Sequence, residues 1–266
     1  MAAVSITRLG TPASSPAGSQ ASSPAFVGGG GTPPVQPPGR RRSIEVSIVV
    51  PTRNEPHLAQ WLETLHASID AEIVVVDDST SPVDALPHAR LIRGPDRGKG
   101  AAVGAGILAA QGEVIVVVDA DLDPPTMKRI PEFVERIRGG TDVVIGERTR
   151  WRYDNAGRFI LSIGLFLAQR LLVFQSARFF DTQCGLKAYR QSAARRLAEL
   201  QTVDGGMYDI EYLYIAVLNR MRIDSVPVAP WPETRATRLR ILRCLRTDPV
   251  DLLRMKWNGI RGRYSA

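Results

Sequence analysis

The chain has 266 residues, a formal net charge of +7 and only two cysteines. Two cysteines are too few and too far apart in sequence to suggest a disulfide framework or a zinc site, so we expect a protein of the reducing cytoplasm. No apolar run reaches the roughly 18 residues that a membrane-spanning helix needs. The nearest run, residues 159–174, is broken by Gln169 and Arg170.

Both ends of the chain differ in composition from its middle. Residues 1–43 are rich in alanine, serine, proline and glycine, so we expect a disordered tail that is not a signal peptide. From Arg235 onward, nine lysines and arginines against two aspartates carry a net +7, which is the whole charge excess. We expect residues 44–235 to form one domain and residues 236–266 to form a basic helical extension.

The charge of this extension has three explanations. An anionic membrane surface is one candidate partner, and an ordinary solvated helix face is the plainer alternative. Nucleic acid is not expected as a partner, because no RNA- or DNA-binding motif accompanies the charge.

Strand and helix signals alternate through the first hundred residues of the domain. Apolar, β-branched runs predict strands at residues 46–50, 73–76, 91–92, 114–118 and 143–145. Helical spacing of apolar residues predicts helices from residue 55 onward, over 101–111 and over 126–138. Further on, we expect a helix at 159–174, a strand within 181–189, a helix at 208–220, a strand at 223–228 and a last helix that begins at Asp248. The alternation favours the α/β class with a mostly parallel sheet.

The strand expected at residues 114–118 leads into carboxylates on alternate positions, Asp119, Asp121 and Asp123. Carboxylates are not buried without partners, so these should emerge at the carboxyl end of the strand, where open α/β sheets bind ligands. Such oxygen ligands suit Mg²⁺ or Mn²⁺, which need few protein ligands when a substrate supplies phosphate oxygens. A helix cap is the plainer alternative, with Asp123 as N-cap and Pro124 at the first helical position.

Polar residues also follow the other expected strands, which is the distribution of a ligand site at one sheet edge. No GxGxxG motif follows the first strand, which disfavours a dinucleotide-binding domain, and no GxxxxGK[ST] motif of a P-loop occurs.

Four motifs, in this order, resemble the inverting GT-A glycosyltransferases of family 2. They are Val-Pro-Thr-Arg-Asn-Glu at 50–55, Asp-Asp-Ser at 77–79, Arg-Gly-Lys-Gly at 97–100 and Asp-Ala-Asp at 119–121. The stretches 181–189, 208–211, 231–233 and 251–253 are similar to polyprenyl-phosphate hexosyltransferases, that is, dolichol-phosphate mannose synthases and dolichyl-phosphate glucosyltransferases. The resemblance covers roughly residues 45 to 260, and the order and spacing of the motifs make the set specific.

The resemblance implies a GT-A fold and transfer of a hexose from GDP-mannose or UDP-glucose to a polyprenyl phosphate. It implies that the nucleotide sugar is bound by Pro51, Asn54, Glu55, Asp77, Asp78, Lys99 and Asp119. Asp119 and Asp121 match the motif that binds Mg²⁺ or Mn²⁺ and diphosphate, and Asp123 would be a third ligand where mannose synthases carry glutamine.

Candidates for the transfer itself, besides Asp121, are Arg148, Arg158, Asp181 and Glu211. Arg158 and Ser162 match positions that handle the acceptor phosphate, and Arg235 matches a basic residue near the C-terminal end. A phosphate acceptor is already an anion at neutral pH, so it needs positioning and charge neutralisation by arginines rather than a strong base.

Many relatives carry transmembrane helices, and this chain is expected to have none. Either the enzyme is cytoplasmic and docks peripherally on the inner face of the cell membrane, or its acceptor is not a lipid. The alternatives to a lipid-phosphate transferase are a soluble glycosyltransferase that acts on a small-molecule or natural-product acceptor, and a non-catalytic module that binds sugar nucleotides.

Overall fold

The computed structural model describes residues 44–81, 85–149, 164, 167–170, 181–230 and 238–265, with the backbone alone for 238–246. The described residues all belong to one compact unit. The tail predicted at residues 1–43 lies outside them, as does most of the helix predicted at 159–174, of which residues 164 and 167–169 are helical. Among the described residues, no helix is both long enough and apolar enough to cross a membrane.

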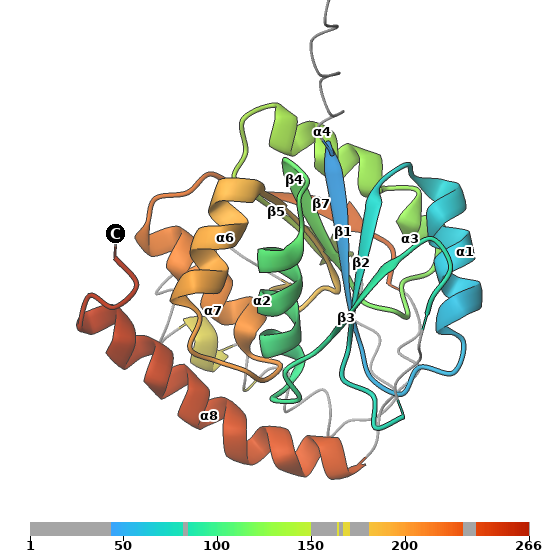
Figure 1. The fold of residues 1–266 in the computed structure, drawn as a ribbon. Helices are drawn as coiled ribbons and strands as arrows, with labels where there is room; N and C mark the ends of the chain where they lie inside the picture. The colour runs from blue at the N-terminus through green and yellow to red at the C-terminus, as the bar shows by residue number, and fades with distance from the viewer. Residues whose placement is uncertain are drawn as a thin grey trace, which may run out of the picture. The chain divides into compact units, whose positions relative to one another are not determined.

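Seven strands form one sheet at the centre of this unit (Figure 1). They are β1 (Val46–Thr52), β2 (Glu72–Asp77), β3 (Arg90–Arg93), β4 (Val114–Val118), β5 (Val143–Arg148), β6 (Leu186–Arg190) and β7 (Ile223–Val228). Their order across the sheet is β3-β2-β1-β4-β6-β5-β7. All neighbouring pairs are parallel except those of β6, which runs antiparallel to β4 and to β5. The predicted mostly parallel sheet is therefore confirmed.

Helices cover both faces of the sheet (Figure 1). They are α1 (Leu58–Ser68), α2 (Lys99–Ala109), α3 (Pro124–Met127), α4 (Ile130–Arg138), α6 (Gln191–Leu200), α7 (Tyr208–Leu218) and α8 (Arg238–Ile260). Alternate residues of β1 point to opposite faces, as in any strand. Val49 packs in the core formed with α2, α6 and α7, whereas Ile48 and Val50 pack in the core formed with α1, α3 and α4. Burial on both faces explains why these strands are almost continuously apolar.

Two observed helices differ from the predicted ones at prolines: Pro131 separates two helices, whereas Pro249, which was predicted to start a helix, lies inside one. The helix predicted over residues 126–138 is split into α3 and α4, because the ring of Pro131 clashes with the carbonyl four residues earlier and ends a continuous helix there. The last helix does not begin at Asp248 as predicted. It begins at Arg238 and continues through Pro249.

The topology brings distant segments to one edge of the sheet. The carboxyl ends of the parallel strands β1, β2, β4 and β5 meet there. Because β6 is antiparallel to β4, its amino end lies at this same edge, where Val118 pairs with Leu186 and the Asp119 amide donates to the carbonyl of Gly185 at 2.9 Å. The loop 181–185 is thus placed beside the carboxylates that follow β4.

Candidate active site

The Asp119 carboxylate at the end of β4 is paired with the first residue of α2. Lys99 Nζ lies 2.7 Å from Oδ1 and 2.8 Å from Oδ2 of Asp119. Burial by itself would lower the pKa of the Lys99 ammonium. The carboxylates of Asp119, Asp209 and Asp121 outweigh burial and raise the pKa above its ordinary value. Lys99 is therefore a fixed cation at the edge where open α/β sheets bind ligands.

The backbone at Gly185 passes close to the Asp119 carboxylate. A Cβ atom added to Gly185 would lie 2.5 Å from Oδ2 of Asp119. Glycine at this position lets the loop that enters β6 pass directly against the carboxylate. The position of Asp119 is thus set from two sides, by Lys99 and by the loop.

The Asp77 carboxylate at the end of β2 has one paired oxygen and one unpaired oxygen. Its Oδ1 accepts hydrogen bonds from the amide of Ser79 at 2.9 Å and from the Ser79 hydroxyl at 2.5 Å. Its Oδ2 is buried and has no hydrogen-bond partner among the described residues, and the same is true of the Thr52 hydroxyl at the end of β1. A buried carboxylate oxygen without a donor costs free energy, which a ligand N–H group would offset if it reached Oδ2 of Asp77.

The turn after β1 is tied to the turn after β2. Asn54 has a positive φ of 53°, and its amide donates to the Ser79 hydroxyl at 2.7 Å. Its side-chain oxygen accepts from the amide of Thr80 at 3.2 Å. Pro51 lies buried in β1, and Glu55, which is partly buried, precedes α1. These residues all lie at the carboxyl ends of β1 and β2, as predicted.

Asp78 holds a neighbouring loop. Its Oδ1 accepts from the amide of Asp96 at 2.8 Å, and a Cβ added to Gly94 would lie only 2.1 Å from the same oxygen. This oxygen of Asp78 therefore holds the loop that contains Gly94 and Asp96 beside the end of β2.

Arg148 and Asp181, which are 33 residues apart, form a two-pronged ion pair. Arg148 Nε lies 2.6 Å from Oδ2 of Asp181, and Nη2 lies 3.1 Å from Oδ1. The Asp181 side chain is buried, and that of Arg148 is partly buried. This geometry suits guanidinium and carboxylate. It fixes the start of the loop 181–185 to the end of β5, a pairing that the sequence did not predict.

The sequence did not predict a second ion pair, which is buried behind this loop. Lys187 Nζ lies 2.7 Å from Oδ1 of Asp209 and donates to the carbonyl of Cys184 at 2.6 Å. Asp209 also contributes to the raised pKa of Lys99, and the ammonium of Lys99 lies 6.0 Å from the centre of the Tyr208 ring. The sequence signal for this pair is the lysine at 187, which stands between Leu186 and Ala188 in β6 and therefore needs a buried partner.

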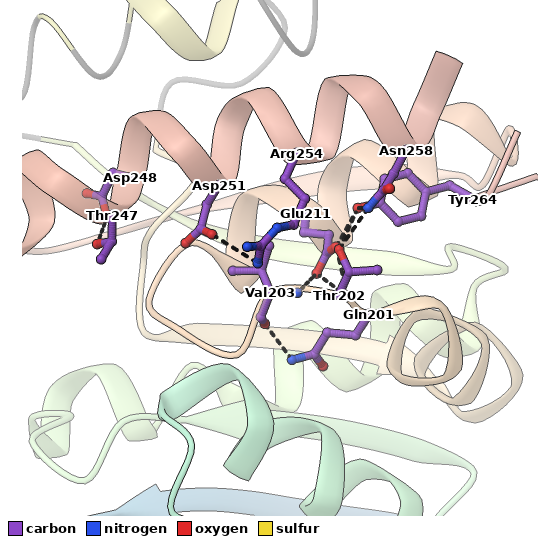
Figure 2. A network of polar contacts seen from close by, with 10 residues as sticks. All are labelled: Gln201, Thr202, Val203, Glu211, Thr247, Asp248, Asp251, Arg254, Asn258 and Tyr264. Carbon is purple, nitrogen blue, oxygen red and sulfur yellow. Dashed lines mark hydrogen bonds and ion pairs between the residues drawn. The ribbon is translucent and has the colours of Figure 1, made fainter. Parts of the chain in front are cut away.

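Glu211 does not join the carboxylates at the strand ends. Its side chain is fully buried, and Figure 2 shows Thr202, Val203 and Tyr264 around its carboxylate. The amides of Thr202 and Val203 each donate to its Oε2, at 3.0 Å and 2.9 Å, and the Tyr264 hydroxyl donates to its Oε1 at 2.5 Å. Both oxygens are occupied, so the geometry favours a structural role for Glu211 over the catalytic role that was predicted.

The three aspartates after β4 do not form a single ligand cluster. The described residues contain no group of three histidine, cysteine or acidic side chains that could hold a metal ion. Asp123 is the N-cap of α3, where its Oδ1 accepts from the Thr126 amide at 3.1 Å, so the plainer alternative accounts for it. The carboxylates of Asp119 and Asp121 are oxygen ligands of the kind that Mg²⁺ and Mn²⁺ prefer, and an ion held by these two would take its remaining ligands from substrate phosphates and water.

Three predicted acceptor-site residues, Arg158, Ser162 and Arg235, lie outside the described residues.

Comparison with known proteins gives a consistent family. The model of Glycosyl transferase family 2 matches residues 47–197. A dolichyl-phosphate beta-glucosyltransferase of Trichomonas vaginalis is 32% identical over 202 residues, which are 69% of this chain and 59% of that protein. This chain therefore spans less than two thirds of the length of that relative. A dolichyl-phosphate hexose transferase of Haloferax volcanii is 28% identical over 193 residues, 69% of this chain and 82% of that protein.

Solved structures agree on the fold. Glucosyl-3-phosphoglycerate synthase from Mycobacterium tuberculosis, in complex with Mn²⁺, UDP-glucose and phosphoglyceric acid, superposes with a TM-score of 0.64. The match covers 80% of this chain and 79% of that chain at 20% sequence identity, which supports a shared GT-A fold. With the family model matching more than half of its length, the chain belongs to glycosyl transferase family 2.

Proposed function

We propose that this enzyme transfers a hexose, with inversion, from a nucleotide sugar to the phosphate of a membrane-borne polyprenyl phosphate. The observation that carries the proposal is the Lys99–Asp119 pair, beside Asp121, at the carboxyl end of β4. The acceptor class is supported by relatives named as dolichyl-phosphate transferases. The relatives named as glucosyltransferases favour UDP-glucose over GDP-mannose as the donor.

The donor would lie along the ends of β1, β2 and β4. Pro51, Asn54 and Glu55 would contact the nucleoside, and the unpaired Oδ2 of Asp77 would accept a hydrogen bond from an N–H group of the base. A bound Mg²⁺ or Mn²⁺ ion, held by Asp119 and Asp121, would neutralise charge on the diphosphate leaving group. Because its pKa is raised, Lys99 stays protonated and would donate to the same diphosphate.

The transfer needs no proton removed from the acceptor. A phosphate oxygen attacks C1 of the sugar, the bond from C1 to the donor oxygen breaks, and the nucleoside diphosphate leaves with the electron pair. Arg158, Ser162 and Arg235 are proposed to hold the acceptor phosphate, since arginine binds phosphate with two parallel hydrogen bonds. Arg148 and Asp181 are proposed as positioning residues, which hold the loop 181–185 against β4.

The chain is further proposed to act peripherally at the inner face of the cell membrane. Residues 236–266 would serve as its basic extension and residues 44–235 as its catalytic domain.

The test is transfer of radiolabel from UDP-glucose or GDP-mannose to polyprenyl phosphate in the presence of Mn²⁺ or Mg²⁺, scored as label extracted into organic solvent. We expect extractable label from the wild type, very little from Asp119→Asn, and wild-type levels from Asp70→Asn, an exposed aspartate that lies before β2 at the opposite end of the strand. Donor turnover without extractable label, in the presence of polyprenyl phosphate, would contradict the lipid acceptor and favour a small-molecule one.

A further inference from the structure

Exposed apolar side chains concentrate on one helix of the protein. Seven large apolar side chains are exposed among the described residues, and four of them belong to α8. These four are Val250, Leu253, Trp257 and Ile260, with exposed fractions of 55%, 59%, 53% and 67%. At about 100° per residue they fall within an arc of about 80°, so they form a single stripe along the helix. We call these four residues the α8 stripe.

The opposite face of α8 is buried, which fixes the rotation of the helix. Leu252 and Met255 are almost fully buried in the core that includes α7. A Cβ added to Gly259 would lie 2.3 Å from the hydroxyl oxygen of Tyr214. Figure 2 shows Asn258 and Tyr264 joined to the network around Glu211. With this face held, the α8 stripe points away from the core.

Cations border the stripe. Arg254 and Arg261 lie on one side of its arc and Lys256 lies on the other, by the same helical spacing. The guanidinium of Arg261 lies 4.5 Å from the centre of the Trp257 ring. The first nine residues of α8 contain four more arginines and no acidic residue. An apolar stripe between rows of arginine and lysine is typical of a helix that lies in the interface of an anionic membrane.

We propose that α8 lies flat on an anionic lipid bilayer and inserts the α8 stripe between the headgroups. The proposal deepens the function proposed above and rests on it, because a polyprenyl phosphate would be presented at that surface. It differs from attraction by charge alone, since apolar insertion persists when salt screens the cations. A second copy of the chain fits this face less well. Four side chains supply far less than the roughly 800 Å² per partner of a stable interface, and the bordering cations of two copies would repel.

The test is flotation of the protein with vesicles of equal parts phosphatidylglycerol and phosphatidylcholine, and with phosphatidylcholine vesicles as the neutral control. The test variant carries Leu253→Ser and Trp257→Ser together. The matched control is Leu108→Ser, which removes another exposed leucine, 47% exposed, from α2. We expect the wild type and the control to float with the anionic vesicles, and the double variant to bind about tenfold or more weakly.

Insertion is read out separately from electrostatic attraction. High salt should weaken vesicle binding by the wild type but leave residual binding that the double variant lacks. Lipids brominated on their acyl chains should quench wild-type tryptophan fluorescence, and Trp257→Phe should lose most of that quenching. Binding that high salt abolishes, with no quenching, would overturn insertion. A concentration-dependent dimer that is lost in the Leu253→Ser, Trp257→Ser double variant, without vesicle binding by the wild type, would assign the α8 stripe to self-association and also overturn insertion.

A short-chain, water-soluble prenyl phosphate separates membrane binding by α8 from transfer activity. If the wild type transfers hexose to a short-chain, water-soluble prenyl phosphate but does not bind vesicles, the α8 inference fails and the proposed function stands. If it binds vesicles through the stripe but transfers to no prenyl phosphate, the proposed function fails and the surface assignment stands. If both hold, the Leu253→Ser, Trp257→Ser double variant should lose transfer to vesicle-embedded acceptor and keep transfer to the short-chain acceptor.

Discussion

Replacing Tyr264 by phenylalanine tests whether the hydrogen bond from Tyr264 to the buried carboxylate of Glu211 stabilises the fold. The Tyr264 hydroxyl lies 2.5 Å from Oε1 of Glu211 and 3.0 Å from the hydroxyl of Thr202 (Figure 2). Its ring packs edge-on against Tyr214, with 6.0 Å between centres. Phenylalanine keeps the ring and removes only the hydrogen bonds of the hydroxyl.

The magnitude follows from the charge of the acceptor. A hydrogen bond to a charged group contributes about 1.5–3 kcal/mol, and one to a neutral group contributes about 1 kcal/mol. Glu211 keeps its backbone donors from Thr202 and Val203, and Asn258 keeps a bond of 3.1 Å to the Thr202 hydroxyl. The expected loss is therefore about 2 kcal/mol of unfolding free energy, which lowers the melting temperature by about 4–8 °C in a domain of this size.

The assay is urea unfolding followed by circular dichroism, together with hydrogen exchange at the amides of Thr202 and Val203. Tyr214→Phe is the matched control, since the Tyr214 hydroxyl has no hydrogen-bond partner among the described residues. Both amides should exchange faster in Tyr264→Phe than in the control. Equal unfolding free energies for the two variants would refute the reasoning that this hydrogen bond stabilises the fold.

Three further predictions concern burial and close packing. Burial raises the pKa of the Cys184 thiol to about 12, so, with the other cysteine replaced by serine, the folded protein should resist thiol labelling at neutral pH and the unfolded protein should not. Burial is the largest cause of a raised pKa at Asp251. The folded state therefore binds the Asp251 proton more tightly than the unfolded state. The resulting stabilisation is fully present below the ordinary aspartate pKa and is lost as the pH rises through the raised pKa. Asp251→Asn should accordingly raise the melting temperature at neutral pH but not at acid pH. A lower melting temperature at neutral pH would show that the ion pair of Asp251 with Arg254, at 3.5 Å, dominates instead. Gly185→Ala should displace the Asp119 carboxylate and weaken nucleotide binding in calorimetry, whereas Gly206→Ala, whose added Cβ meets no atom within 4 Å, should not.

Local patterns in the sequence predict most of the sheet, because strands buried on both faces must be apolar and must end in polar turns. The positions of Asp77, Asp119 and Arg148 at one edge follow from that rule. The direction of β6 could not be predicted, since a short strand carries no signal of whether its neighbours run parallel to it. The break between α3 and α4 had a visible signal in Pro131, which the helical spacing of the apolar residues obscured.

The roles of acidic side chains depend on partners that are distant in sequence. Glu211 resembles a solvated or catalytic acid at the start of a helix, but its donors come from residues 202–203 and from Tyr264, which is 53 residues away. Lys187 and Asp209 are likewise 22 residues apart. Asp123 is the opposite case, since Pro124 beside it already indicates a helix cap. The same Asp-Pro signal fails at Asp248, which lies inside α8. Local signals therefore predict strand ends and some helix caps, whereas buried networks require the fold.

The ends of β2 and β4 are proposed to bind a nucleotide sugar together with a divalent ion. Calorimetric titration of UDP-glucose and GDP-mannose into the wild type, Asp77→Asn, Asp119→Asn and Asp70→Asn, with Mn²⁺ and with EDTA, tests this site. The wild type and Asp70→Asn should bind one of the donors tightly with Mn²⁺ and at least tenfold more weakly with EDTA. Asp119→Asn should lose the Mn²⁺ dependence, and Asp77→Asn should bind more weakly under both conditions. Unchanged, Mn²⁺-dependent affinity in both Asp77→Asn and Asp119→Asn would show that these strand ends do not bind the donor.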